Sequence, residues 1–326
     1  RATMDGYALV AESVEGATPY NRIALRVVGD ALPGAPFGSA VTRGEAVRIM
    51  TGAPMPAGAD AVLPAESVET NAAIAAVSPG KHIGRRGEDI VSGTTVLEAG
   101  RVLRPQDLGV MSSIGLPDVN VIRRPRVRLV ITGNEVLPAG SRPGGFQITD
   151  ANGPMLAALA ERDGAIVDLP GLVRDAPEAI LAALHASADI IIVSGGSSVG
   201  VEDLAPMLLA THGVLAVHGI AMRPSSPTGM GTLGQRLVFL LPGNPVSALC
   251  AYDFFAGRAI RALGGRPKEW LYRSVRAPLA RKISSPIGRL DYARVKLEGG
   301  RVEPLSVSGA SVLSSTTRAD GFVIVG

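Results

Sequence analysis

Strand patterns and helix patterns alternate through the middle of the chain, between about residues 121 and 265. This alternation predicts a parallel α/β sheet with helices on both faces, because a helix is the usual connection between parallel strands. The segment 190–193 is the best-defined strand, since four consecutive β-branched residues are typical of a strand buried on both faces. The other expected strands are 127–131, 166–169 and 237–241, and the expected helices are 153–161, 177–185, one from about 204, and 246–263.

The regions on either side of this alternation have a different pattern. Residues 1 to about 120 carry short β-rich runs at 23–28, 46–50 and 61–63, separated by Gly and Pro, and one helical pattern at 105–114. After Gly265, short alternating runs return at 272–276, 291–297 and 321–325 and predict a small C-terminal β domain. We therefore expect an α/β multidomain protein with a central parallel sheet.

Composition narrows the class of protein. A chain of 326 residues predicts two to four domains. It has no apolar run long enough for a bilayer, and its single cysteine excludes a disulfide framework and fits a reducing cytoplasm. A net charge of +3 and only 6 Phe, 5 Tyr and 1 Trp argue against a nucleic-acid partner. The cluster Arg123, Arg124, Arg126 and Arg128 is expected at a solvated sheet edge.

A turn of small residues follows the strand at 190–193 and leads to a helix. Ser194, Gly195, Gly196, Ser198 and Gly200 expose backbone N–H groups there, and such turns bind phosphate-like anions. The turn ends in Glu202 and Asp203, which would repel an anion unless a cation lay between them. The turn therefore indicates an anion site with a metal. The alternative is a tight connection in which Asp203 only caps the helix.

Three acidic residues are expected at the carboxyl edge of the parallel sheet, where ligands bind in such folds. Glu135 follows the first strand, Asp150 precedes the first helix, and Asp203 follows the 190–193 strand. Clustered carboxylates need a divalent cation, a shared proton or an arginine, and oxygen ligands without Cys or His favour Mg²⁺ as the cation. Alternatively, Asp150 and Asp203 are only helix caps and Glu135 is only a turn residue.

Two further segments reach the same edge. The turn Pro242, Gly243, Asn244 and Pro245 joins the last strand to the last helix, and its prolines hold the backbone N–H groups ready for a ligand. Residues 222–229 combine Arg223 with hydroxyl groups and prolines, which is typical of either an anion clamp or a plain surface loop.

Six ordered motifs make the chain resemble the molybdopterin molybdenumtransferase family, which includes bacterial MoeA and the E domain of gephyrin. The resemblance covers nearly the whole chain. The motifs are MDGYA at 4–8, RIMTGA at 48–53 with GADAV at 58–62, GEDI at 87–90, TGNE at 132–135, SGGSSVG at 194–200 and LPGNPVSA at 241–248.

The resemblance implies Mg²⁺-dependent insertion of molybdate into adenylylated molybdopterin with release of AMP. It also implies a homodimer that shares its active cleft between subunits, with possible molybdoenzyme or cofactor-biosynthesis partners. The single cysteine and the lack of a long apolar run predict a cytoplasmic protein with no membrane association. The domains it implies are a mixed β domain (1–79), part of an elongated helical domain (80–121) whose N-terminal part would lie upstream of Arg1, an α/β molybdopterin-binding domain (122–266) and a C-terminal β domain (267–326).

Family site positions carried over by the resemblance include the three acids and two more residues, Asp5 and Thr51. Asp203, Asp150 and Glu135 would hold Mg²⁺, Asp5 and Thr51 would orient the pterin from another domain or the partner subunit, and the turns 194–200 and 242–245 would bind the substrate.

The chain also departs from the family pattern. Relatives commonly carry Lys-Pro-Gly-Lys-Pro where this chain has Arg223-Pro224-Ser225-Ser226-Pro227, so the second cation is missing and weaker oxyanion binding is expected. Ser197 replaces the usual Val and Asn134 the usual acidic residue. These departures motivate one alternative, a non-catalytic protein that binds molybdopterin or finished cofactor. A second alternative is a molybdopterin adenylyltransferase, which would consume ATP with bare molybdopterin.

Overall fold

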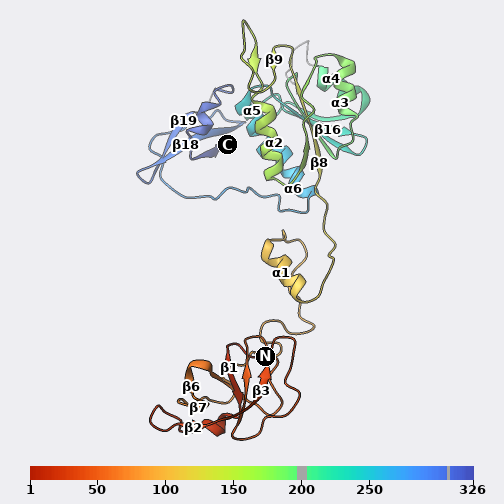
Figure 1. Cartoon of the computed structure of the whole chain (residues 1–326). Helices are drawn as coiled ribbons and strands as arrows, with labels where there is room; N and C mark the ends of the chain where they lie inside the picture. The colour runs from red at the N-terminus through yellow and green to blue at the C-terminus, as the bar shows by residue number, and fades with distance from the viewer. Residues whose placement is uncertain (197–203, 307–308) are drawn as a thin grey trace. The chain divides into compact units, whose positions relative to one another are not determined.

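The computed structural model describes residues 1–196, 204–306 and 309–326. These form two compact units, Arg1–Glu98 and Ala99–Gly326, whose elements are labelled in Figure 1. In the described part of the chain, no helix combines the length and apolarity needed to cross a bilayer.

The first unit consists of short strands, as the β-rich runs predict. A four-stranded sheet has the order β3-β4-β1-β5, and a three-stranded sheet has the order β2-β7-β6. The elements are β1 (Gly6–Leu9), β2 (Ile23–Ala24), β3 (Arg26–Ala31), β4 (Glu45–Ile49), β5 (Ala61–Pro64), β6 (Val68–Glu69), β7 (Ala72–Ala73), and the single 3₁₀ turns Ala11–Val14 and Ala65–Ser67.

The central strand β1 of the four-stranded sheet is buried on both faces. Ala8 of β1 packs in one apolar cluster and the next residue, Leu9, packs in another. Successive residues of a strand point to opposite faces, so β1 carries apolar residues without alternation. This explains why the run at 61–63 is apolar at every position: Val62 belongs to the first cluster and Leu63 to the second.

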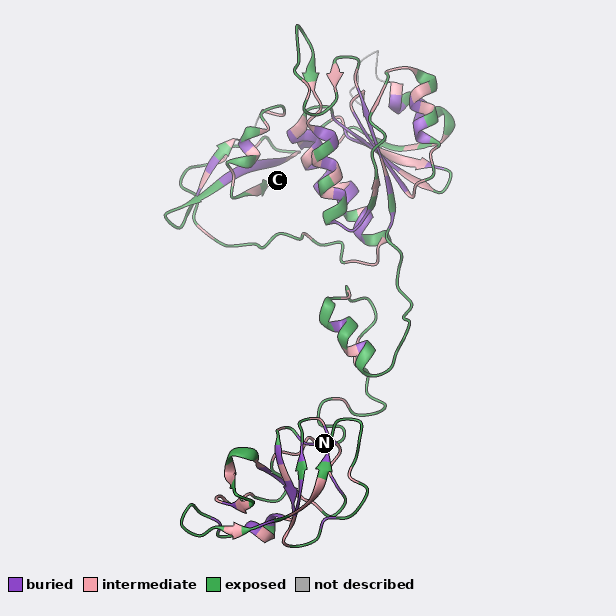
Figure 2. Ribbon diagram, in the orientation of Figure 1, coloured by how far each residue is buried: buried purple, intermediate pink, exposed green. Residues whose placement is uncertain are grey.

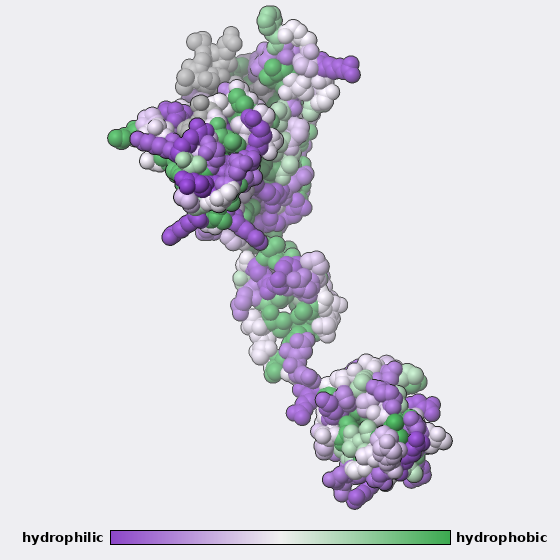
Figure 3. Space-filling view, turned by 90° about the vertical axis from the view of Figure 1, so that its left-hand side faces the viewer, coloured by the Kyte–Doolittle hydropathy of each residue, from purple (hydrophilic) through white to green (hydrophobic). Residues whose placement is uncertain are grey.

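Residues 80–121 contain one helix, α1 (Pro105–Ser113). The helix predicted at 105–114 is confirmed, with Pro105 in its first turn. The segment exposes several large apolar side chains: Val102, Leu108, Ile114, Leu116 and Val119. Figure 3 shows the hydropathy of the residues on one face of the chain.

The second unit contains the predicted α/β sheet. Its strand order is β11-β8-β13-β17-β16-β14, with β12 also paired to β8. The pairs β11–β8, β8–β13 and β13–β17 are parallel, as expected. The strands are β8 (Arg126–Thr132), β11 (Ile166–Asp168), β12 (Leu172–Val173), β13 (Ile190–Ser194), β14 (Val214–His218), β16 (Gly229–Leu233) and β17 (Arg236–Leu241).

Helices cover both faces of this sheet. Ile190 and Ile192 of β13 pack on one face with the core that includes α2 (Asn152–Arg162), α5 (Pro245–Ala251) and α6 (Gly257–Leu263). Ile191 and Val193 pack on the other face against α3 (Pro177–Leu184) and α4 (Leu204–His212). The central strands are accordingly buried in Figure 2, which confirms the interpretation of the β-branched run.

The structure corrects two details of the predicted sheet and helices. The sheet is mixed, because β16 and β14 add an antiparallel edge that the sequence analysis did not predict. Most of β14 is exposed, so its sequence lacks the apolar signal of a central strand. The helix expected at 246–263 is continuous, but a π-helical turn (Tyr252–Ala256) separates α5 from α6.

The C-terminal β structure is confirmed in part. Strands β18 (Leu290–Glu298), β19 (Arg301–Ser306) and β20 (Gly321–Val325) form a sheet that also includes β15 (Met222–Arg223), and α7 spans Ser314–Thr317. The strand expected at 272–276 is wrong, because that segment is irregular. There the Tyr272 hydroxyl donates to Asp253 (2.9 Å) and its ring packs edge-on against Phe322. Tyr272 is thus held by side-chain contacts rather than by strand pairing.

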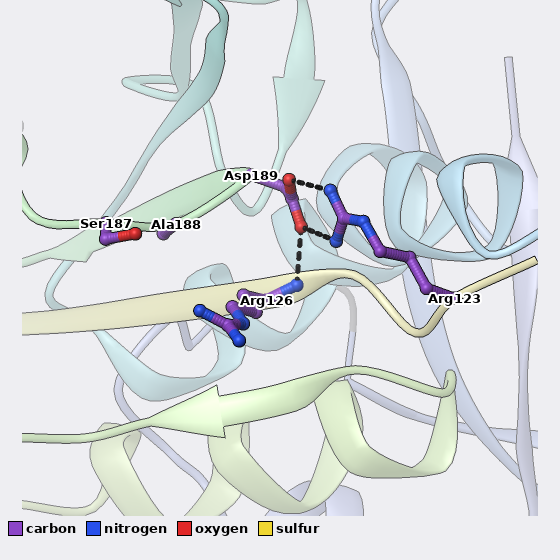
Figure 4. Close-up of a pocket in the computed structure, with 5 residues that line it drawn as sticks. All are labelled: Arg123, Arg126, Ser187, Ala188 and Asp189. Atoms are coloured by element: carbon purple, nitrogen blue, oxygen red, sulfur yellow. Dashed lines mark hydrogen bonds and ion pairs between the residues drawn. The ribbon is translucent and has the colours of Figure 1, made fainter.

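The amino edge of the sheet is held by an ion pair. Arg123 donates two hydrogen bonds to the Asp189 carboxylate (2.6 and 2.7 Å), which also accepts the backbone N–H of Arg126 (2.8 Å; Figure 4). Arg128 similarly pairs with Asp168. Of the arginine cluster expected to be solvated, Arg123 therefore pairs with Asp189, just before β13, and Arg128 with Asp168, the last residue of β11.

We expect Asp189 to make the stability of the second unit pH-dependent. The Arg123 hydrogen bonds lower the Asp189 pKa from 3.8 to about 2. Because the folded-state pKa is depressed, the stabilisation is complete above the unfolded-state value and is lost as the pH falls through that interval. The thermal midpoint of Asp189→Asn, followed by circular dichroism, should fall less steeply than that of the unaltered protein below about pH 4. An equal slope would contradict this, and Asp118→Asn at an exposed site is the control.

Candidate functional site

The carboxyl ends of β8, β13 and β17 border a cavity of about 680 Å³, here called the carboxylate cavity. This is the edge at which ligands bind in open parallel sheets. The expected site residues that line it are Glu135, Asp150, Ser194, Gly195, Gly196, Gly243, Asn244 and Pro245. Ser198, Gly200 and Asp203 lie outside the described residues.

Three carboxylates of the described residues line this cavity. The structure brings Glu135 and Asp150 together as expected and adds Asp175, which the sequence analysis missed. Asp175 accepts hydrogen bonds from the Thr132 hydroxyl and from the backbone N–H of Asn134 (3.1 Å). Asp175 follows β12, whose parallel pairing with β8 brings its end to the same edge. That strand has only two residues, too few for a recognisable pattern.

The helix-cap alternative for Asp150 is also partly realised. Its Oδ1 accepts the backbone N–H of Gly153 (2.8 Å) in the first turn of α2. A carboxylate in this position stabilises the helix start, yet the same side chain lines the carboxylate cavity. Asp150 therefore combines a structural contact with a place at the cavity wall.

The described wall of the carboxylate cavity is negatively charged. The described residues of its wall include no Lys, Arg or His. Two carboxylates about 4 Å apart repel by about 4 kcal/mol at an effective dielectric constant of 20. Within the described residues no group of three acidic, His or Cys side chains is arranged to hold a metal ion. Mg²⁺ is commonly held by one or two carboxylates with water and substrate phosphates, and the donor set of Glu135 and Asp150 fits that pattern.

Asn152 connects three chain segments at the cavity and was not predicted as a site residue. Its Nδ2 donates to the Ser194 hydroxyl (2.9 Å) and to the Gly243 carbonyl (2.7 Å). These bonds join the start of α2 to the end of β13 and to the turn after β17. Since Asn152 is only 7% exposed, they form in a low-dielectric setting and fix the cavity wall.

The described part of the predicted anion turn has the backbone that only glycine adopts readily. Gly195 and Gly196 have φ values of 102° and 52°. A Cβ at Gly195 would overlap the Thr132 carbonyl. The two glycines thus let the chain pass close to β8 at the wall of the carboxylate cavity.

A second cavity of about 340 Å³, here called the arginine cavity, lies on the other side of the turn after β17. Of the expected site residues, Arg223, Pro242 and Asn244 line it, and Arg289 and Ser226 also contribute. Arg223 is held in a two-bond pair by Asp291, with its Nε and Nη2 donating at 2.9 and 2.6 Å. Arg289 lies 3.5 Å from the same carboxylate. Two guanidinium groups beside one fully buried carboxylate leave a net positive wall.

Asp5 and Thr51 lie together in the first unit. The Asp5 Oδ1 accepts both the backbone N–H (2.7 Å) and the hydroxyl (2.8 Å) of Thr51. These hydrogen bonds lower the pKa of Asp5 below its usual value of 3.8 and keep it ionised.

Known families match three stretches of the chain. Residues 1–115 match the MoeA N-terminal region (domain I and II), residues 128–262 match a probable molybdopterin binding domain, and residues 276–326 match the MoeA C-terminal region (domain IV).

Relatives and solved structures cover most of the chain. A molybdopterin molybdenumtransferase 2 of Mycobacterium tuberculosis is 37% identical over 91% of this chain and 76% of its own length. A molybdopterin molybdenumtransferase of Haemophilus influenzae is 32% identical over 99% of this chain and 82% of its own. A solved molybdopterin biosynthesis MoeA protein from Pyrococcus horikoshii is 33% identical, with a TM-score of 0.81 over 100% of this chain and 83% of that one. The chain therefore belongs to the molybdopterin molybdenumtransferase family, transferases of molybdenum cofactor biosynthesis.

Proposed function

We propose that this protein inserts molybdate into adenylylated molybdopterin and releases AMP with the help of Mg²⁺. The observation that carries the proposal is the pair of adjoining cavities with opposite charge at the carboxyl edge of the sheet. One is walled by carboxylates that require a cation, and the other by guanidinium groups that attract an oxyanion. The names of the relatives point to molybdopterin and molybdenum, and the resemblance supplies the adenylylated form of the pterin and the oxyanion molybdate.

The described residues that line the two cavities include groups suited to binding each proposed substrate. The phosphates of the pterin nucleotide would lie against the backbone at Gly195 and Gly196, near Glu135 and Asp150, which would hold Mg²⁺. Bound there, Mg²⁺ would supply positive charge to the oxygens of the phosphoanhydride that breaks. Molybdate would enter the arginine cavity, where Arg223 and Arg289 balance its charge.

Further features of the proposal come from the resemblance. We propose a cytoplasmic homodimer in which Asp5 and Thr51, on another domain or on the partner subunit, orient the pterin. The proposed domains remain 1–79, 80–121, 122–266 and 267–326. The ionised Asp5 offers an acceptor for N–H groups such as those of a pterin.

The assay measures AMP after anaerobic incubation of the full-length dimer with adenylylated molybdopterin, molybdate and Mg²⁺. We expect AMP release that EDTA abolishes and that excess Mg²⁺ restores. Parallel reactions with tungstate measure the preference for the oxyanion. Absence of AMP release from protein that binds both substrates would overturn the proposal.

One observation favours a second candidate function. Arg223 is already paired with Asp291, and Ser226 supplies no charge where relatives commonly have lysine. A weakened oxyanion cavity fits a protein that only binds molybdopterin or the finished cofactor. This candidate expects tight pterin binding without AMP release, and binding that Asp203→Asn leaves unchanged.

Replacing Ser226 with Lys should strengthen molybdate binding about fivefold. A unit charge about 4 Å from an anion in bulk water is worth about 1 kcal/mol, which corresponds to that factor. The gain should shrink as ionic strength rises. Calorimetric titration with molybdate measures the affinity. Ser187→Lys adds the same charge beside the amino end of β13, at the opposite edge of the sheet, and should leave the affinity unchanged. Equal affinities of Ser226→Lys and the unaltered protein would contradict the assignment of the cavity.

A further inference from the structure

The wall between the two cavities is made of two chain segments. Residues 242–245 follow β17, and residues 309–311 precede α7. Gly243, Pro245 and Ser311 line the carboxylate cavity, whereas Pro242, Gly309 and Ala310 line the arginine cavity. The backbone N–H of Val246 donates to the Ala310 carbonyl (2.9 Å) and joins the two segments. Among the described residues, Asn244 alone lines both cavities.

The Asn244 carboxamide is exposed and is not used to cap a helix. Asn244 precedes α5 at the position where Asn is among the preferred capping residues. Its side chain makes no capping hydrogen bond, although its own carbonyl accepts the N–H of Ala248 (2.9 Å). The usual local reason for Asn at this position is therefore missing, while Asn244 lines both cavities.

The backbone that carries Asn244 is rigid. Pro242 and Pro245 restrict φ on either side of it. The Gly243 carbonyl next to it accepts a hydrogen bond from the buried Asn152 (2.7 Å). The backbone at this position is preorganised, so it loses little entropy when a ligand binds.

A carboxamide matches the opposite polarities of the two cavities. Its NH₂ group donates to an oxyanion, and its oxygen accepts from an N–H or O–H group. We propose that Asn244 contacts the ligands of both cavities at once and couples their binding, so that molybdate binds more tightly when the carboxylate cavity is filled. This inference rests on the proposed function for the identity of the ligands, adenylylated molybdopterin and molybdate.

Calorimetry tests the coupling under conditions that stop turnover. Molybdate is titrated into the full-length protein in EDTA, first alone and then saturated with adenylylated molybdopterin. We expect about a tenfold gain in molybdate affinity on saturation, within the range usual for coupled sites. Asn244→Ala should reduce this gain to less than twofold. Asn120→Ala, the same change at an exposed site outside both cavities, should keep it.

Conservative variants separate the coupling from a folding defect. Asn244→Ser retains a small polar group and should fold as the unaltered protein does, with little coupling. Asn244→Asp should weaken molybdate binding about tenfold, because a carboxylate repels the oxyanion. The inference is overturned if Asn244→Ala keeps the full gain, or if the unaltered protein shows no gain. A gain without AMP release in Mg²⁺ would overturn the proposed function and support the inference.

Discussion

Asp150→Asn should lower the rate of Mg²⁺-dependent AMP release about 100-fold. The change removes the charge that would hold Mg²⁺ but keeps an oxygen able to accept the Gly153 N–H, so the start of α2 should survive. Loss of one group that stabilises developing charge typically costs a factor of 10²–10³. The initial rate of AMP release is measured across a Mg²⁺ titration, and the half-saturating Mg²⁺ concentration should rise as well. Glu135→Gln should behave in the same way.

The rate of Asp150→Asn distinguishes a role of Asp150 in holding Mg²⁺ from a role as the cap of α2. If the residue only caps α2, Asp150→Asn should release AMP at the original rate, and Asp150→Ala should be less stable but active once folded. Asp118→Asn removes an exposed carboxylate elsewhere and should leave the rate unchanged. Near-original activity of both Asp150→Asn and Glu135→Gln would exclude the carboxylate cavity as the Mg²⁺ site.

The parts of the fold that depend on local pattern could be predicted from the sequence. The β-branched residues of β13 and the apolar positions of α2 reflect burial in a continuous core, so their pattern is strong. The edge strand β14 is largely exposed and β12 has two residues, so neither carries such a pattern. Tyr272 begins an alternating run that is typical of a strand, but its hydroxyl donates to Asp253 and anchors an irregular segment. In β12, in β14 and around Tyr272, contacts with distant residues decide the conformation more than the local sequence pattern does.

The residues of the candidate site also divide into those that a local sequence pattern predicts and those that it does not. Glu135 and Asp150 lie at the ends of recognisable elements, and topology places both at one sheet edge. Asp175 and Asn152 were missed because their contacts, to Thr132 and Asn134 and to Ser194 and Gly243, come from residues distant in sequence. The pairing of Arg223 with Asp291 also joins residues 68 positions apart, which no local pattern reveals.

Asp163 organises a buried polar network on the helical face of the second unit. Its carboxylate is fully buried and accepts a hydrogen bond from the Tyr252 hydroxyl (2.8 Å). Arg261 (3.0 Å) and Arg162 (3.2 Å) pair with the same oxygen. Arg261, only 2% exposed, also donates to backbone carbonyls of the segment after α6, at Pro267 and Lys268. The network thus ties α2 and the π-helical turn to the start of the C-terminal segment.

Asp163→Ala should destabilise the second unit by about 3–5 kcal/mol, because it leaves the buried charge of Arg261 without its partner. Urea denaturation followed by the fluorescence of Trp270, the single tryptophan, measures the loss, since its ring packs edge-on against Phe254 (5.0 Å between centroids). Asp168→Ala removes a 58% exposed partner of Arg128 and should cost less than about 1 kcal/mol. Equal midpoints for the two variants would mean that water or rearranged carbonyls neutralise Arg261, and that the network fixes geometry rather than stability.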